Sequence, residues 1–295
     1  MRVSTYLSQW LNTHNNLAPR TRDSYAATIR LHIAPAIGKR KLLKLKPGHV
    51  SDMLTAIMAK GHSRTAELCY AILHAALRAA VLRGLIPASP MDQVARPAHQ
   101  PCHYPHLDQD QIPRYLAAVE GDRLALAWLL ALLCGLRRGE LCGLRWEAVD
   151  LHAMQIHITA QRVTLANGHT IDTPPKSAAG RRIVPIPAAL LPLLAVSQQP
   201  TGYVVTRTDG QPYTPSGLDH AHRTMIRRAG LPRVPPHGLR HTMATIAVTS
   251  GVHMRVLQAL LGHSSYQITA NTYAHVDQRA AMSAIDSIAA TMIQS

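Results

Sequence analysis

Phenylalanine is absent from this sequence of 295 residues, and tyrosine and tryptophan together supply only 4% of it. Hydrophobic residues nevertheless make up 47% of the chain, which is enough for a proper core. Such a core must be packed by aliphatic side chains, and leucine and alanine favour helices. We therefore expect a mainly α-helical protein of one large or two ordinary domains.

Acidic residues are also scarce, because 16 Asp and Glu stand against 31 Lys and Arg, which gives a formal net charge of +15. The sequence has no clustered carboxylate triad to hold Mg²⁺, no P-loop and no GxGxxG after a strand, which argues against a two-metal nuclease or polymerase. Residues 1–98 alone hold 14 Lys and Arg against 4 Asp and Glu. This excess of positive charge indicates a polyanionic partner, and nucleic acid first of all.

Signals for disulfides, membranes and metals are missing as well. The four cysteines form no CxxC pair, so we expect reduced thiols in a cytosolic protein. The N-terminus has no signal-peptide pattern, and the most apolar run, Leu124 to Leu136, is too short to span a bilayer. His237 and His241 have the spacing of a helical zinc site, but Gly238 stands where a zinc protease needs Glu. We expect neither a metal nor another cofactor.

Hydrophobic periodicity divides the chain into three parts. Helices at about 3–14, 21–33, 47–60 and 63–83 form a basic helical domain over residues 1–88, with Pro35 and Gly38 ending the second helix. Residues 89–106 are rich in Pro, Ala and His and read as a linker. Residues 107–295 form a second, α-rich domain, in which residues 154–186 predict one small antiparallel sheet around an Asn167-Gly168 turn.

The stretch from His237 to Tyr273 reads as two short helices that Gly251 and Gly262 can end. In the first helix Leu239, Met243 and Ile246 predict a buried face. His237 and Arg240 share the opposite face, since they are three residues apart. Burial does not explain why polar residues occupy these positions.

Six residues, taken together in their order along the chain, suggest phosphoryl transfer without a metal. Two arginines can bind the oxygens of a phosphodiester, and a tyrosine can attack the phosphorus and hold the cut strand. A lysine on a mobile loop can protonate the leaving oxygen, and a histidine near a helix start lies beside N–H groups that attract the same phosphate. Each residue alone also has a structural explanation, as a helix cap, a solvated lysine or a packing tyrosine. The six are Arg137, Lys176, His237, Arg240, His263 and Tyr273.

Five short motifs together resemble the tyrosine recombinase (phage integrase) family. They are GLRRGEL, PPKSAAGRR, HGLRHTMAT, LGHSS and NTYAH. The resemblance implies that the six residues are catalytic, that Tyr273 rather than Tyr266 is the nucleophile, and that Glu140 braces the site. RTRDSY and HIAPAIGKRKL resemble the family's core-type DNA-binding domain. The implied fold is a helical domain over 1–88 followed by an α-rich catalytic domain with a small antiparallel sheet. We expect no separate arm-binding domain, since the resemblance starts at the core-type domain.

The resemblance also implies a function. It predicts a site-specific DNA recombinase that cuts and rejoins duplex DNA through a covalent 3′-phosphotyrosyl intermediate and a Holliday junction. It implies free monomers that form a homo-tetramer on double-stranded DNA, with the last helix, at about 278–293, docked on a neighbouring protomer. We expect a DNA-associated protein of the cytoplasm, from a bacterium or a phage, with no membrane partner. Two alternatives are a type IB topoisomerase activity and a DNA-binding protein with a relic active site.

Basic residues of the first domain are the candidate DNA contacts, although a solvated basic face would have the same composition. Contacts to DNA phosphates would make binding depend steeply on salt. The candidates are Arg20, Arg22, Lys39, Arg40, Lys41, Lys44, Arg64 and Arg78.

Overall fold

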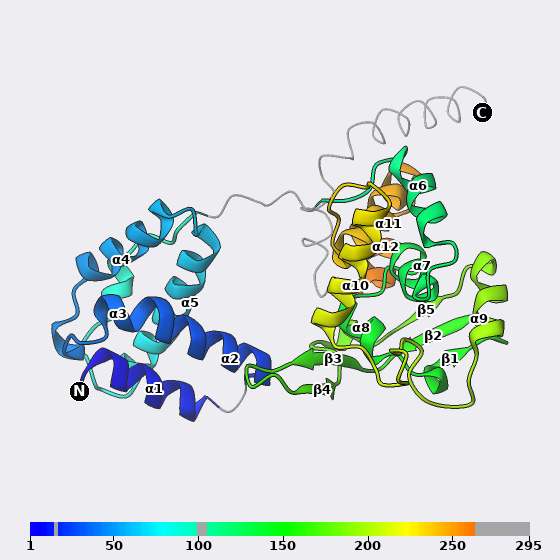
Figure 1. The fold of residues 1–295 in the computed structure, drawn as a ribbon. Helices are drawn as coiled ribbons and strands as arrows, with labels where there is room; N and C mark the ends of the chain where they lie inside the picture. Colours follow the sequence, from blue (N-terminus) through cyan, green and yellow to red (C-terminus); the bar gives the residue numbers. More distant parts are fainter. Residues whose placement is uncertain (15–16, 99–104, 263–295) are drawn as a thin grey trace, which may run out of the picture. The chain divides into compact units, whose positions relative to one another are not determined.

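The computed structural model describes residues 1–14, 17–98 and 105–262. The chain divides into two compact units (Figure 1), one of residues 1–103 with 165–167 and one of residues 104–164 with 168–295. Each unit has its own hydrophobic core. The mainly α-helical fold with small antiparallel sheets agrees with the class predicted from the sequence.

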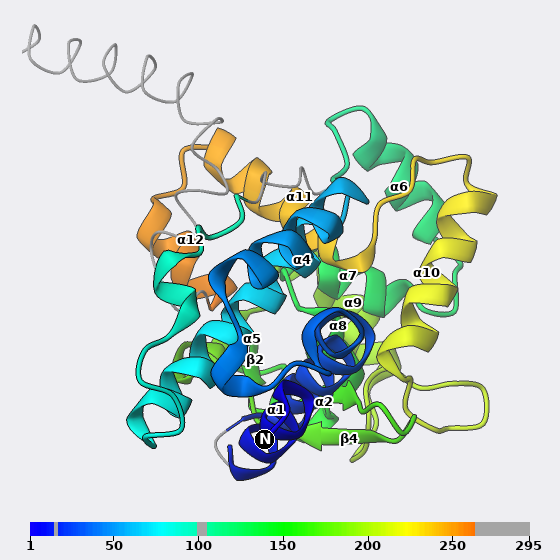
Figure 2. The ribbon, with the colours of Figure 1, turned by 90° about the vertical axis from the view of Figure 1, so that its left-hand side faces the viewer.

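The first unit is helical. Its core is built around the large buried side chains Tyr6, Trp10, Ile33 and Leu77. Helix α4 packs against α5, and α1 against α2 (Figures 1 and 2). The helices are α1 (Val3–Thr13), α2 (Pro19–Thr28), α3 (Ala34–Ile37), α4 (Pro47–Ala59) and α5 (Ser63–Leu82).

Pro35 does not end the second helix, so that part of the prediction was wrong. The helical path runs from α2 through a π-helical turn, Ile29–Ile33, into α3, which ends at Ile37. Pro35 follows the π-helical turn, in which the N–H of Ala34 bonds the carbonyl oxygen of Ile29. This local change in the hydrogen-bond pattern accommodates a residue that has no N–H to donate.

Ordered packing in the first unit continues past residue 88. Pro90–Gln93 forms a 3₁₀ turn, and Met91 and Val94 are buried in the core of this unit. Helix α5 is the one helix in the described part of the chain that is long and apolar enough to cross a membrane. Its Ile72, Leu73 and Leu77 are fully buried in the same core, which is the behaviour of a core helix in a globular unit.

The second unit sets helices against two small sheets. Trp128 and Leu130 of α7 lie at the centre of its core. Its helices are α6 (Gln111–Val119), α7 (Ala125–Leu133), α8 (Arg138–Gly143), α9 (Leu191–Ser197), α10 (Pro215–Arg228), α11 (Pro236–Thr249) and α12 (Met254–Leu261). Its strands are β1 (Val149–Asp150), β2 (Gln155–Ile158), β3 (Gln161–Thr164), β4 (Thr170–Thr173) and β5 (Arg182–Pro185).

The predicted single sheet is in fact two antiparallel sheets. One has the order β1-β2-β5, with Ile156 opposite Val184, and the other is the hairpin of β3 and β4, with Val163 opposite Ile171. The chain leaves the first sheet after Ile158 and returns to it only at β5, so the hairpin that contains Asn167-Gly168 is inserted between two paired strands.

Packing between elements distant in sequence brings four short segments together. Helix α11 packs on α7, α8 packs on β3, and α12 packs on both α11 and β5. The loop between α7 and α8, the first turns of α11, the end of α12 and the start of β5 therefore meet on one part of the second unit.

Candidate active site

Arg137 directly precedes α8 and is held on two sides. Its Nη1 donates to Oε1 of Glu140 at 2.7 Å, and its Nη2 donates to the carbonyl oxygen of Gly262 at 2.8 Å. Its backbone N–H donates to Oε2 of Glu140 at 2.8 Å, which caps the helix. The side chain remains 30% exposed. The guanidinium is thus fixed in direction and still open to solvent.

Arg240 lies on α11 and is 2% exposed. Its Nη1 donates to the carbonyl oxygen of Gly135 at 2.7 Å, and its Nη2 donates to the carbonyl oxygen of Leu261. The predicted faces of this helix were partly wrong, since Ile246 of the expected buried face is 40% exposed. The two carbonyl groups explain the burial of Arg240, because a buried cation must be compensated by hydrogen bonds.

Glu140 is the carboxylate shared by this cluster, and it is 3% exposed. Burial by itself raises the pKa of a carboxyl group, since it disfavours the charged form. The hydrogen bonds and positive charges of Arg182 and Arg137 outweigh that effect and lower the pKa of Glu140 to about 2. Glu140 is therefore ionised at neutral pH and forms ion pairs with both arginines.

Arg182, at the start of β5, belongs to the same cluster and was missed in the sequence. Its side chain is 6% exposed, and it donates to both oxygens of Glu140, at 2.8 and 2.9 Å. In the sequence it is one of two adjacent arginines, Arg181 and Arg182, at the edge of a predicted strand. The alternation of the strand could have indicated it, because Arg182 lies on the same face as the buried Val184 and Ile186, whereas Arg181 does not.

His237 lies in the first turn of α11 and is exposed to solvent. Its pKa is lowered below 6.5, first by partial loss of hydration and then by the positive charges of Arg240, Arg137 and Arg138, while Glu140 acts in the opposite direction. The imidazole therefore lies within the electrostatic field of the arginine cluster and is mainly neutral at pH 7.

Lys176 is exposed in the loop between β4 and β5. In the part of the chain that the structure describes, no hydrogen bond or ion pair joins it to the arginine cluster. The far end of its loop does reach the cluster, because the carbonyl oxygen of Ala179 lies against Gly262. His263, Tyr266, Tyr273 and the predicted last helix lie outside the described residues.

The candidate DNA contacts of the first unit are largely exposed. Arg64 forms an ion pair with Glu67, and Nη2 of Arg22 donates to Oδ1 of Asn12 at 3.2 Å. The remaining candidates are exposed to solvent, namely Arg20, Lys39, Arg40, Lys41, Lys44 and Arg78.

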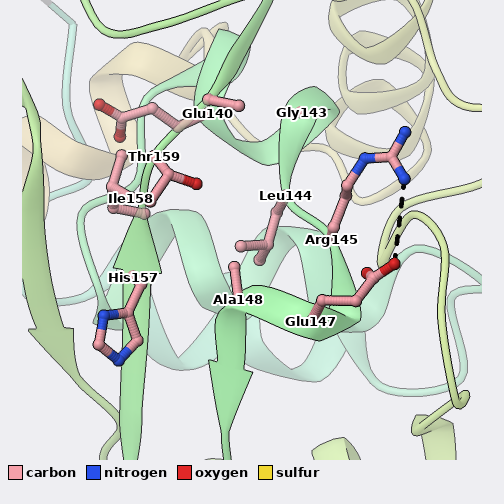
Figure 3. Close-up of a pocket in the computed structure, with 10 residues that line it drawn as sticks. Glu140, Gly143, Leu144, Arg145, Glu147, Ala148, His157, Ile158 and Thr159 are labelled. Atoms are coloured by element: carbon pink, nitrogen blue, oxygen red, sulfur yellow. Dashed lines mark ion pairs between the residues drawn. The ribbon is translucent and has the colours of Figure 1, made fainter.

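A pocket of about 450 Å³ is lined by Glu140, by residues between the end of α8 and β1, and by the end of β2 (Figure 3). Glu140 lies at one end, and Arg145 and Glu147, whose charged atoms are 4.0 Å apart, lie at the other. His157 and Thr159 also line the pocket. Arg137, Arg182 and Arg240 do not, so the pocket is separate from the exposed side of the arginine cluster.

Histidine, cysteine and acidic side chains are the usual protein ligands of metal ions. In residues 1–14, 17–98 and 105–262 they form no group of three or more that could hold an ion. His241, one half of the zinc-like spacing, is buried and contacts His106 edge to face at 5.0 Å.

Family models match both units of the chain. The phage integrase family matches residues 105–279, and the phage integrase central domain matches residues 4–96. The tyrosine recombinase XerC-like protein of Caldanaerobacter subterraneus subsp. tengcongensis is 31% identical over 204 residues, which are 61% of this chain and 52% of that protein, about half its length. Tyrosine recombinase XerC of Alcanivorax borkumensis is 26% identical over 93% of this chain and 89% of its own.

Solved structures with the same fold include two integrases bound to DNA. The Tn1549 transposon integrase in complex with transposon right end DNA has a TM-score of 0.85 at 21% identity, covering 98% of this chain and all of that one. A lambda integrase tetramer bound to a Holliday junction has a TM-score of 0.67 at 19% identity, covering 90% of this chain and 78% of that one. The family match extends over more than half of the sequence. The chain belongs to the phage integrase family of tyrosine recombinases.

Proposed function

We propose that this protein is a site-specific DNA recombinase that cuts and rejoins duplex DNA. One strand of the duplex would be cut by attack of the Tyr273 hydroxyl on a phosphodiester. The hydroxyl loses its proton and its oxygen forms a bond to phosphorus, while the bond to the 5′ oxygen breaks and that oxygen takes up a proton. A 3′-phosphotyrosyl link remains. The reverse reaction, with the 5′ hydroxyl of a partner strand, restores the phosphodiester and gives a Holliday junction after one round of exchange.

The observation that carries this proposal is the meeting of Arg137 and Arg240 at the end of α12. They lie 103 positions apart in the sequence and bond the consecutive carbonyl groups of Gly262 and Leu261. The next residue in the chain after Gly262 is His263. Two arginines with fixed directions can bind the non-bridging oxygens of one phosphate and stabilise the charge of its transition state.

The remaining roles follow from chemistry. His237, mainly neutral at pH 7, can donate or accept a hydrogen bond at the same phosphate. Lys176 is exposed on a loop and can give its proton to the departing 5′ oxygen. Positive side chains would thus do the work that Mg²⁺ does in other phosphoryl transfers, which makes the proposed reaction independent of metal and of other cofactors.

The proposed assembly is a tetramer on double-stranded DNA, formed from free monomers. Residues 1–88 would serve as the core-type DNA-binding domain and 107–295 as the catalytic domain. Of the proposed linker, 89–106, the turn at Pro90–Gln93 and Val94 pack on the first unit, so only the remainder would act as a connection. The last helix, at about 278–293, would dock on the neighbouring protomer. In a cell such a protein acts on the nucleoid, in the cytoplasm of a bacterium that carries the gene or its phage.

Two rival functions make different predictions. A type IB topoisomerase would relax supercoiled plasmids of any sequence without exchanging strands between duplexes. A DNA-binding protein with a relic site would bind DNA and form no covalent adduct. The geometry around Glu140 supports a working site over a relic, because a buried carboxylate with two arginine partners holds Arg137 in a fixed direction while its side chain stays 30% exposed.

A covalent-capture experiment tests the proposal. Full-length protein is mixed with a library of nicked duplexes of random sequence, and DNA that stays bound in denaturant is sequenced. A recombinase should enrich one motif, and two plasmids that carry this motif should recombine. Adducts without sequence preference, together with plasmid relaxation, would favour the topoisomerase, and binding without any adduct would favour the relic.

A further inference from the structure

Arg182 fastens two parts of the candidate site to each other. Its Nε donates to the carbonyl oxygen of Leu260 at 2.7 Å, and its two Nη atoms donate to the two oxygens of Glu140. Nη1 also approaches the carbonyl oxygen of Gly180 at 3.4 Å. Four of the five guanidinium N–H groups are occupied in this way. Arg182 therefore has little capacity left to bind a substrate itself.

Three arginines hold three consecutive carbonyl groups at the end of α12. Arg182 binds Leu260, Arg240 binds Leu261 and Arg137 binds Gly262, so each of the three carbonyl groups has its own arginine. The last carbonyl groups of a helix have no partner within it and carry partial negative charge, which cations compensate. The end of α12 is thereby fixed relative to β5, α11 and the loop before α8.

The contact at Gly262 is too close for any side chain. Gly262 has the left-handed conformation, with φ of 60° and ψ of 48°. A Cβ atom there would lie 2.6 Å from the carbonyl oxygen of Ala179 and 2.9 Å from Cδ of Arg182. The loop that contains Lys176 is therefore packed, at its far end, directly on the helix end that leads to His263.

We infer that Arg182 is a positioning residue that sets the direction of Arg137 and fixes the end of α12 at Leu260. The link to Arg137 runs through Glu140. Oε1 of Glu140 accepts from Nη1 of both arginines, at 2.7 and 2.8 Å, while Oε2 accepts from Nη2 of Arg182 and from the backbone N–H of Arg137. Arg182 thus holds the carboxylate in the orientation that Arg137 needs. This inference rests on the proposed function.

Removal of Arg182 should make the rate of adduct formation depend on the protonation of Glu140. Among the residues that the structure describes, the charged or titratable groups that act on Glu140 are Arg137 at the start of its own helix, Arg182 on β5 and His237 on α11. Without Arg182 the carboxyl group of Glu140 is still buried, which raises its pKa. It has lost the partner that lowers this pKa most, so the pKa of Glu140 rises. Protonation of Glu140 would then release Arg137 as the pH falls, which does not happen in the wild-type protein over the same range.

The test compares three variants of the full-length protein on nicked duplexes from the captured library. Arg182→Met removes the positive charge, and Arg182→Lys retains a positive charge. Arg123→Met is the matched control, because Arg123 also bonds a backbone carbonyl group in this unit, that of Thr206 at 2.8 Å, away from α12. Circular dichroism checks folding, salt-dependent binding gives the affinity for DNA, and the rate of adduct formation is measured at saturating DNA from pH 5 to 9.

Arg182→Met should bind DNA as wild type does and form the adduct about 100-fold more slowly, the effect of misplacing a reacting group by about 1 Å. Its rate should fall further toward pH 5, unlike that of wild type, and Arg182→Lys should recover part of both losses. The control should react at the wild-type rate. If Arg182→Met does not fold, the pH profile of Arg182→Lys decides in its place.

Two results would overturn the inference. One is a folded Arg182 variant with the wild-type rate and pH profile, and the other is an equal loss in the Arg123 control. Failure of the proposed function looks different, because the wild-type protein itself would then form no adduct, and the inference would fall with it.

Discussion

Replacing Glu140 by glutamine should destabilise the second unit because it leaves two arginines without their shared counter-ion. Glu140 is 3% exposed and forms ion pairs of 2.7 Å with Arg137 and 2.8 Å with Arg182. Glutamine has nearly the same shape but no charge, so it retains packing and loses the electrostatic part. Breaking a buried ion pair by removing one partner typically costs about 3–5 kcal/mol.

The pKa of Glu140 gives a second measure of the same free energy. A carboxyl group whose pKa falls from 4.5 to about 2 on folding contributes about 3 kcal/mol at neutral pH, since each tenfold change in ionisation is worth about 1.4 kcal/mol. The folded-state pKa is the lower one, so this stabilisation is complete well above pH 4.5 and is lost as the pH falls toward 2. By pH 3 about 2 kcal/mol of it should be gone.

Urea unfolding at pH 7 and pH 3 measures both quantities. Tryptophan fluorescence follows the second unit through Trp128 and Trp146 and the first unit through Trp10. The glutamine variant should lose about 3 kcal/mol at pH 7 in the transition of the second unit alone, and clearly less at pH 3. Asp219→Asn is the matched control, because its partner Arg138 is 39% exposed and the pair should contribute below about 1 kcal/mol. Equal losses in the two variants, or a loss that does not change with pH, would refute the reasoning.

Three further predictions concern a glycine, a histidine and a basic loop. A side chain in the left-handed conformation costs roughly 1–2 kcal/mol. In thermal unfolding, Gly251→Ala, with φ of 77° and open space around it, should lose only this free energy of unfolding, whereas Gly262→Ala should lose more. The NMR titration midpoint of His237 should lie below 6.5 and fall further when Glu140 becomes glutamine, since the carboxylate raises the pKa; a midpoint at or above 6.5 would contradict the electrostatic interpretation. Replacing residues 39–41 by serine should flatten the log–log salt dependence of DNA binding by about 0.9 for each DNA phosphate that the loop no longer neutralises, and an unchanged slope would exclude this loop from the interface.

Much of the fold was predictable because periodicity reports local burial. Helix α5 follows from the spacing of its apolar residues, and the hairpin of β3 and β4 follows from its Asn167-Gly168 turn, both of which are local features of the sequence. Pro35 misled the prediction, because a proline does not always end a helix. A π-helical turn lies just before it and changes the hydrogen-bond pattern, and the helical path continues to Ile37.

The chemistry of the site was harder to predict because it depends on partners distant in sequence. Arg240 was expected on an exposed face, yet two carbonyl groups from other segments make its burial possible. Strand alternation places Arg182 on the face of the buried Val184 and Ile186, but an arginine is buried only with a partner, and that partner, Glu140, lies 42 positions earlier. Short motifs therefore identify candidate site residues, whereas the side chains that hold them in place become visible only in the folded chain.

The most direct test of the central claim is the identity of the residue that becomes attached to DNA. Wild-type protein is trapped on the captured nicked duplex, digested, and the DNA-linked peptide is sequenced by mass spectrometry. The proposed mechanism predicts the link at Tyr273, no adduct with Tyr273→Phe, and a normal adduct with Tyr266→Phe. A link at Tyr266, or an undiminished adduct in Tyr273→Phe, would contradict it.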